Sequence, residues 1–130
     1  MPKMKIKYMK NQTEIVNIKD ISDCLKRTVS ELLKMFSYHL GTSVNIKNRL
    51  ILGLYDFECL HKHLLNYIEK YILCNYCNNP ETIYILIKNS LYLKCCACPG
   101  NTKINDQSNL KDYITRNITK TNENFKNIYQ

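Results

Sequence analysis

The sequence predicts an α+β protein, in which a small α/β domain of three helices and a short sheet is followed by a C-terminal four-cysteine ribbon. Its 130 residues suffice for one domain or two very small ones. Apolar residues recur at helical spacing three times in the first half. In the second half, two Cys-x-x-Cys pairs flank two strand-like runs.

Four segments follow from these patterns. We expect a basic arm or edge strand at 1–13, an α/β core domain at 14–72, the ribbon at 73–107, and a polar, partly disordered tail at 108–130. In the first segment, Lys3, Lys5 and Lys7 alternate with apolar residues, which in a strand would place three ammonium groups on one side. A frayed terminus would fit the same pattern.

Capping signals define the first two helices. Asn17 with Asp20 resembles a capping box and predicts a helix up to residue 27, with Cys24 among its core residues. Thr28 with Glu31 predicts the start of a stronger helix that stops at Gly41.

A third helix and two pairs of strands complete the prediction. Asp56 is the expected cap of a helix to residue 72, and its buried stripe comprises Phe57, Leu60, Leu64, Ile68 and Tyr71. Apolar runs on either side of residues 47–48 predict a hairpin, and the runs at 83–88 and 91–94, separated by residues 89–90, predict the ribbon strands.

The paired cysteines admit three chemistries: a redox dithiol, two disulfides or one metal site. Seventeen residues separate Cys74-x-x-Cys77 from Cys95-x-x-Cys98, a spacing typical of a zinc ribbon. The chain has no βαβ pattern that would suit a redox dithiol, and a reducing compartment disfavours disulfides. We therefore expect these four thiolates to bind one zinc ion. Because sulfur fills every position, the zinc is structural and no catalytic residues are expected.

The remaining cysteines and histidines receive structural interpretations. Cys96 is expected to be a spacer between ligands, and Cys59 lies on the flank of the third predicted helix. His61 and His63, two residues apart on that helix, would point in different directions and are expected at the surface, as is His39.

The formal charge of +8 favours a polyanionic partner, either nucleic acid or an anionic membrane surface. The candidate RNA-binding residues are lysines of the N-terminal segment and of the ribbon: Lys3, Lys5, Lys7, Lys10, Lys88, Lys94 and Lys103. A solvated, merely solubilising face is the alternative. The N-terminus lacks the apolar run of a signal peptide, and we expect a cytoplasmic location.

Four stretches resemble a known family, the core shared by the beta subunit of translation initiation factor 2 and the amino-terminal domain of initiation factor 5. They are IVNIKDI at 15–21, LLKMFSYHLGTSVNI at 32–46, YIEKYILCNYCNNPET at 67–82 and CCAC at 95–98. The LGTS sequence is more similar to the beta subunit, whereas NPET is more similar to factor 5. We favour the beta subunit.

The resemblance implies a non-enzymatic subunit of the ternary complex of GTP and initiator methionyl-tRNA, acting in start-codon selection. Its implied partners are the gamma GTPase subunit, initiator tRNA, and mRNA or the small ribosomal subunit. Two alternatives stay open: a factor 5-like GTPase-activating accessory and a zinc-ribbon interaction protein of transcription. The first would require an arginine that reaches a nucleotide site, and the arginines of the sequence are Arg27, Arg49 and Arg116.

Overall fold

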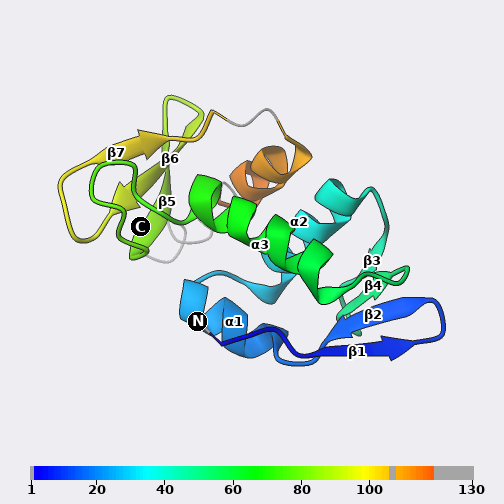
Figure 1. The fold of residues 1–130 in the computed structure, drawn as a ribbon. Coiled ribbons are helices and arrows are strands. Elements are labelled where there is room, and N and C mark those ends of the chain that lie inside the picture. Colours follow the sequence, from blue (N-terminus) through cyan, green and yellow to red (C-terminus); the bar gives the residue numbers. More distant parts are fainter. Residues whose placement is uncertain (1, 106–107, 119–130) are drawn as a thin grey trace. The chain divides into compact units, whose positions relative to one another are not determined.

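A computed structural model describes residues 2–105 and 108–118. The chain divides into two compact units, Met1–Glu69 and Lys70–Gln130. The first unit holds a four-stranded sheet with helices, and the second holds a three-stranded sheet (Figure 1). This architecture confirms the predicted α+β class.

The sheet of the first unit is antiparallel, in the order β1-β2-β4-β3. Its strands are β1 (Ile6–Met9), β2 (Gln12–Ile15), β3 (Val44–Asn45) and β4 (Leu50–Leu52). β1 is therefore an edge strand, which agrees with the strand interpretation of 1–13 and not with a frayed terminus. β2 lies between β1 and β4 and pairs with both. The hairpin predicted around residues 47–48 is formed by β3 and β4.

Helices α1 (Ile18–Leu25) and α2 (Val29–Leu40) follow the two predicted segments closely. At the start of α2, the backbone N–H of Glu31 donates to Oγ1 of Thr28 at 3.1 Å, so this cap is confirmed. At its end Gly41 has φ of 67°, which is the left-handed stop that glycine adopts without strain.

Asn17 occupies the N-cap position of α1, and its carbonyl accepts from the backbone N–H of Ile21 at 3.2 Å, but the predicted capping box is wrong. Its side chain makes no cap hydrogen bond and instead holds the N-terminal segment. Its Oδ1 accepts from the backbone N–H of Lys5, and its Nδ2 donates to the carbonyl of Lys3, both at 2.8 Å. An amide carries both a donor and an acceptor, which allows Asn17 to bridge two backbone groups of one extended segment.

The expected core position of Cys24 was also wrong, because its side chain is exposed. Ile18, Ile21, Ser22 and Leu25 form the buried face of α1. At about 100° per residue, Ser22 completes this arc while Cys24 lies beyond its edge.

Helix α3 (Phe57–Tyr71) begins after Asp56, whose Oδ1 accepts from the backbone N–H of Cys59 at 2.8 Å. Its buried stripe differs from the prediction by a small rotation. Leu60, Leu64 and Tyr71 are buried as expected, but Tyr67 is buried while Phe57 and Ile68 are only half-buried. Residues 60, 64, 67 and 71 follow the 4-3-4 spacing of a single helix face more closely.

Helices α2 and α3 lie side by side in antiparallel directions. The hydroxyl of Tyr67 donates to the carboxylate of Glu31 near the start of α2. Near the end of α2, the ring of His39 stacks on the ring of His63 of α3, with ring centroids 5.8 Å apart. Leu33 and Phe36 of α2 are each 1% exposed, so the helix pair supplies much of the core of the first unit.

The second unit is built on a three-stranded antiparallel sheet in the order β5-β6-β7. Its strands are β5 (Thr82–Ile87), β6 (Ser90–Cys95) and β7 (Asn101–Lys103). Lys88 and Asn89 connect β5 to β6 with φ of 51° and 64°. Two positive φ values are typical of a two-residue hairpin turn that matches the twist of the strands, so the turn lies one residue earlier than predicted.

The segment predicted as a polar tail begins with a helix. Residues 109–118 are helical, and Leu110 and Ile114, four residues apart, are buried on one face. Two apolar positions among many polar ones were too weak a periodicity to predict this helix. The rest of the expected tail, 119–130, lies outside the described residues.

Candidate metal centre and basic surfaces

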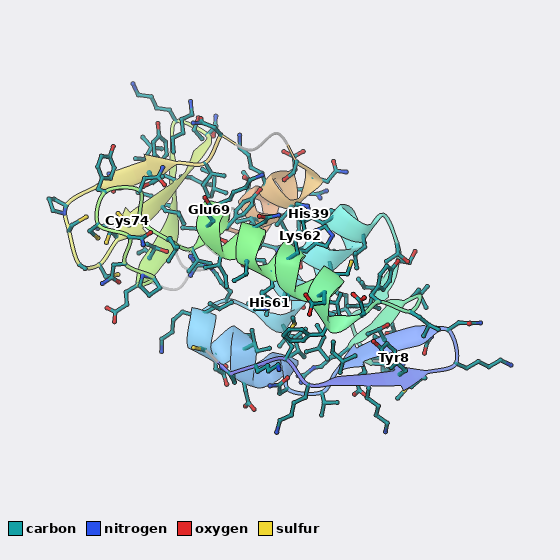
Figure 2. All side chains as sticks on the ribbon, in the orientation of Figure 1. Tyr8, His39, His61, Lys62, Glu69 and Cys74 are labelled. Atoms are coloured by element: carbon teal, nitrogen blue, oxygen red, sulfur yellow. The ribbon has the colours of Figure 1, made fainter. Side chains whose placement is uncertain are left out.

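The sulfur atoms of Cys74, Cys77, Cys95 and Cys98 all lie within 4.8 Å of one another. Figure 2 shows sulfur atoms, drawn in yellow, beside the labelled Cys74. The Cys74–Cys98 and Cys77–Cys95 sulfur pairs are 3.7 and 3.5 Å apart. Sulfurs at the corners of a tetrahedron with metal–sulfur bonds of about 2.3 Å would be about 3.8 Å apart. The four thiols therefore have the spacing that one tetrahedral metal ion requires.

Two tight turns present these sulfurs. In the first, Asn78 has φ of 60° and its backbone N–H donates to the carbonyl of Cys74 at 2.8 Å. In the second, the backbone N–H of Cys95 donates to the carbonyl of Gly100 at 3.3 Å. Each turn brings the two cysteines of a Cys-x-x-Cys pair to the same side.

Backbone amides also point at the sulfurs. The N–H groups of Tyr76, Ala97 and Gly100 donate to Cys74, Cys95 and Cys98 respectively, at 3.3 to 3.4 Å. Such donors stabilise a thiolate over a thiol because they interact with its negative charge. The turns thus favour the ionised form that binds metals.

The pKa values of the thiols reflect both these donors and the crowding of four sulfurs. Hydrogen bonding from the backbone of Cys77, together with that from Tyr76, lowers the pKa of Cys74 to about 6. The backbone of Asn79 favours the thiolate of Cys77, but hydrogen bonding with Cys95 and desolvation outweigh it and raise the pKa of Cys77 to about 12. Without a cation, the raised pKa values of Cys77 and Cys98 favour their protonated thiols, whereas the lowered pKa of Cys74 favours its thiolate. A divalent ion would replace those protons.

The donor set also limits what the centre can do. Four sulfurs complete a tetrahedron and leave no position for water or substrate, so the arrangement suits a structural ion rather than a catalytic one. Cys74 and Cys95 are buried, which anchors the centre in the sheet, while Cys77 is exposed. Cys96 is exposed, and its backbone N–H donates to the carbonyl of Glu81, as befits a spacer.

The histidines do not gather into a second centre in the described part of the chain. His61 stacks on Phe57 with ring centroids 5.0 Å apart, whereas His63 stacks on His39. The two helix neighbours therefore point in different directions, as predicted. His39, His61 and His63 are all half-buried rather than fully exposed, because each packs against another ring.

The lysines of the N-terminal segment are exposed, but the backbone that carries them is anchored. Asn17 holds this backbone, and the ammonium of Lys3 lies 5.1 Å from the ring centroid of Phe57 in a cation–π contact. Lys7 lies directly opposite Glu14 in the β1–β2 register, which reduces the local positive potential. Lys10 occupies the turn between these strands.

The candidate lysines of the ribbon share one region of its sheet. Lys94 on β6 and Lys103 on β7 are exposed on the same face of the sheet. Tyr92 lies directly opposite Lys103, and Lys94 shares the face of Tyr92 because the two residues are two positions apart on one strand. Lys88 is exposed in the β5–β6 turn. The structure therefore brings the ribbon lysines into one region.

Sequence reasoning missed two exposed features of the ribbon. Tyr76, between the first two cysteines, is 71% exposed, and its ring lies against Gly100 of the other turn. Ile83 and Ile87 of β5 are exposed as well. The strict alternation of isoleucine in TIYILI was a signal that three apolar side chains would share one sheet face.

An α/β unit joined by a long helix to a four-cysteine ribbon defines the class of protein: a small domain with an attached metal-binding ribbon. Residues 1–101 match the family model of a domain found in the beta subunit of initiation factor 2 and in initiation factor 5, and the match spans both parts. The chain belongs to this family of translation initiation factor domains. None of the helices in the described residues is long and apolar enough to cross a membrane.

Relatives come from both branches of the family. The chain is 34% identical over 111 residues to eukaryotic translation initiation factor 5 of Dictyostelium discoideum, covering 84% of this chain and 28% of that protein. Factor 5 of Saccharomyces cerevisiae is 35% identical, with 82% and 27% covered. The translation initiation factor 2 subunit beta of Methanopyrus kandleri is 37% identical over 100 residues, with 75% and 72% covered. The chain thus spans about a quarter of each factor 5 relative.

Proposed function

We propose that this protein is a non-enzymatic translation initiation factor component that acts like a beta subunit in the ternary complex of GTP and initiator methionyl-tRNA. The observation that carries the proposal is the family match over residues 1–101, together with 37% identity to an archaeal beta subunit. In this role the protein acts in the cytoplasm on start-codon selection, and its partners are the gamma GTPase subunit, initiator tRNA, and mRNA or the small ribosomal subunit.

The metal in the four-cysteine centre is zinc under this proposal. Cys74, Cys77, Cys95 and Cys98 offer four thiolates, and zinc is the common choice for a closed tetrahedral sulfur site with a structural role. The ion would hold the two turns together and so maintain the sheet between them. Its binding energy would supply much of the folding energy of this small unit.

The beta-subunit branch is favoured because the LGTS segment, which begins at the last residue of α2, is similar to the beta subunit. Thr42 donates from Oγ1 to the carbonyl of Leu52 at 2.8 Å, and its own carbonyl accepts from the hydroxyl of Ser37 at 2.6 Å. This segment therefore ties the end of α2 to β4. Its role is to keep the helix pair and the sheet of the first unit in one fixed arrangement.

RNA association is the part of the proposal that rests on charge. The first unit carries 11 Lys and Arg against 7 Asp and Glu, and the second carries 8 against 4, so both are basic. Lys5, Lys7 and Lys10 project from an anchored backbone, which reduces the entropy lost when they contact phosphates. Phosphate contacts of this kind position an RNA without reading its sequence.

A factor 5-like GTPase-activating role is the second candidate, favoured by the 34% identity to factor 5 and by the NPET segment. Reconstitution separates the two. The protein is added to a gamma GTPase subunit loaded with GTP and to initiator methionyl-tRNA, and both tRNA retention and GTP turnover are measured.

We expect increased tRNA retention with unchanged GTP turnover. Faster turnover would favour the factor 5-like role instead. No effect on either quantity, together with recovery of RNA polymerase from cell extract, would favour the transcription alternative and reject the proposal.

A further inference from the structure

A hollow that is open to solvent lies beside β1 in the first unit. It is lined by Tyr8, which is labelled on the ribbon in Figure 2, and by Leu54, Tyr55 and Asp56 of the segment that connects β4 to α3. Its volume is about 370 Å³. The lining combines two aromatic rings, one aliphatic side chain and one carboxylate. Mainly apolar walls with a few polar groups are the usual composition of a site for a small ligand or for one group of a larger one.

Hydrogen bonds hold the walls of this hollow in place. The hydroxyl of Tyr8 donates to the carbonyl of Tyr55 at 2.8 Å, which ties β1 to the connecting segment. The backbone N–H of Tyr55 donates to Oγ1 of Thr13 at 3.1 Å, and the hydroxyl of Thr13 donates to the carbonyl of Gly53 at 2.7 Å. The hollow is therefore formed before a ligand binds, which lowers the entropy that binding costs.

The two tyrosine rings are positioned differently. A Cβ at Gly53 would lie 2.9 Å from Cε2 of Tyr55, so this ring rests directly on the backbone of the glycine. The φ of Gly53 is 104°, a conformation that residues with a side chain rarely adopt. Tyr8 is 52% exposed although its hydroxyl is bonded. Its ring therefore offers an open and fixed surface on which another planar group can stack.

Asp56 contributes a carboxylate with acceptor capacity to spare. Its Oδ1 accepts from the backbone N–H of Cys59 at 2.8 Å, as the cap of α3. Its side chain makes no other hydrogen bond or ion pair with the described residues. An ionised carboxylate has about four acceptor sites and no donor. Asp56 can therefore accept hydrogen bonds from a ligand that presents donors to the hollow.

Positive charge borders the hollow on two sides. Lys10 precedes Asn11, whose carbonyl accepts from the backbone N–H of Gly53 at 2.7 Å. On the other side, the ammonium of Lys3 lies 5.1 Å from the ring centroid of Phe57, the first residue of α3. The first thirteen residues include four lysines and no acidic residue. This charge attracts a polyanion and disfavours a cationic ligand.

We propose that this hollow binds one unstacked base of single-stranded RNA and that Asp56 makes guanine the preferred base. This role rests on the proposed RNA association of the first unit and adds a contact that reads the RNA. The base stacks on the exposed ring of Tyr8 and contacts Leu54, and its flanking phosphates lie towards the lysines. Phosphate contacts alone would position the RNA, whereas unstacked bases are read on aromatic rings and by hydrogen bonds to their edges.

The carboxylate is the observation that selects guanine. The Watson–Crick edge of guanine carries two neighbouring donors, N1–H and the 2-amino group, and both can donate to one carboxylate. Uracil has a single N–H between two carbonyl oxygens, which a carboxylate repels. Adenine and cytosine each carry one amino donor beside a ring nitrogen that is itself an acceptor. Asp56 can therefore form two hydrogen bonds with guanine and at most one with each of the other bases.

The experiment compares four hexaribonucleotides that are uridylate throughout except at the fourth position, which is uridine, guanosine, adenosine or cytidine. The full-length, zinc-loaded protein is titrated with each at low salt, and the amide resonances of residues 8 and 53–56 report on the hollow. We expect the guanosine RNA to bind about tenfold more tightly than the all-uridine RNA, which is the discrimination that a two-bond contact to a base provides. The largest resonance shifts should lie at these residues.

Two substitutions separate stacking from base reading. Y8A should weaken binding of all four RNAs at least about fivefold because it removes the stacking ring, whereas Y8F should retain most of the affinity. D56N should keep α3 capped, because asparagine caps helices as well as aspartate does. Its amide offers one donor and one acceptor in place of two acceptors. D56N should therefore abolish the preference for guanosine in a protein whose amide spectrum is otherwise unchanged.

Two control variants make the same chemical changes at exposed positions outside the hollow. Y76A removes the exposed ring of the first cysteine turn, and D20N neutralises an exposed carboxylate of α1. Both should preserve the preference for guanosine. A peptide that alternates glycine with arginine probes the other chemistry that tyrosine rings and a carboxylate could hold, a cationic side chain. We expect it to bind at least about tenfold more weakly than the guanosine RNA.

The contrary outcomes are distinct. RNA binding that Y8A and D56N leave intact would place the RNA elsewhere and spare the proposed RNA association, whereas no binding of any RNA would reject both. Equal affinity for the four RNAs would mean that Asp56 reads no base and would overturn the preference for guanine. Tighter binding of the arginine peptide than of RNA, lost in both Y8A and D56N, would make the hollow a site for a cationic side chain of a protein partner.

Discussion

The hydroxyl of Tyr67 on α3 donates a hydrogen bond to the carboxylate of Glu31 on α2, and both side chains are buried, at 1% and 7% exposure. Hydrogen bonds to charged acceptors are stronger than neutral ones, and a buried carboxylate that loses a donor carries a desolvation cost. This contact therefore fixes the position of α3 along α2 in the core of the first unit.

Replacing Tyr67 by Phe should lower the free energy of unfolding by about 1–3 kcal/mol, because the ring remains and only the donor is lost. Urea denaturation measures this. Y38F on α2 is the matched control, since Tyr38 is half-buried, and should change stability by less than about 0.5 kcal/mol. Equal effects of the two variants would mean that the Tyr67–Glu31 bond contributes nothing specific.

Asn17 should respond to substitution as a bridge between backbone groups and not as a helix cap. N17S keeps a good capping residue but cannot span from the carbonyl of Lys3 to the N–H of Lys5, so it should release the N-terminal segment as N17A does. Hydrogen exchange at the Lys5 amide is the measurement. At Thr28, whose hydroxyl does cap a helix, T28S keeps the hydroxyl and should preserve stability, whereas T28A should lower it. Full rescue by N17S would restore the capping interpretation.

Metal removal should unfold the ribbon and spare the helical unit. Purified protein should contain one zinc ion per chain, and C74S should lose both the zinc and the dispersed amide signals of the ribbon sheet. C96S should retain both, because Cys96 is an exposed spacer. Atomic absorption and two-dimensional amide spectra are the measurements. Protein without zinc, or with an iron chromophore, would contradict the assignment.

Gly100 and Tyr76 should be coupled. A Cβ on Gly100 would lie 2.5 Å from Cδ2 of Tyr76, closer than van der Waals contact allows, so G100A must displace the tyrosine ring. We expect G100A to destabilise the ribbon by about 1–3 kcal/mol, as overpacking does. In a Y76A background the same change should cost much less. A double-mutant cycle measured by chelator-induced unfolding tests this, and additive effects would show that the ring does not oppose the new methyl group.

Binding of structured RNA should weaken steeply with salt if the lysines of the first unit contact phosphates. K5Q, K7Q and K10Q should each reduce the log–log salt slope by about 0.7–0.9 without changing sequence preference. K3Q should have a smaller effect, because Lys3 also lies over the Phe57 ring. K62Q is the control on an exposed lysine of α3. Binding that ignores all three substitutions would make these lysines a solvated face.

The sequence by itself determined the features that depend on neighbouring residues. Thr28 with Glu31, Asp56 and Gly41 mark helix ends because caps and stops involve groups within a few residues of each other. The spacing of the four cysteines likewise predicted that their sulfurs would meet, since two tight turns and a hairpin have little freedom in how they close.

Only the tertiary structure decided which long-range partner each side chain finds. Asn17 had the local pattern of a cap, yet the N-terminal segment lies beside it and takes both of its hydrogen bonds. Tyr67 is buried because its hydroxyl meets Glu31, 36 residues away in the chain. Ile83 and Ile87 of β5 are exposed because the sheet has one covered face and one open face, and the sequence alternates in the same way whichever of the two faces is covered.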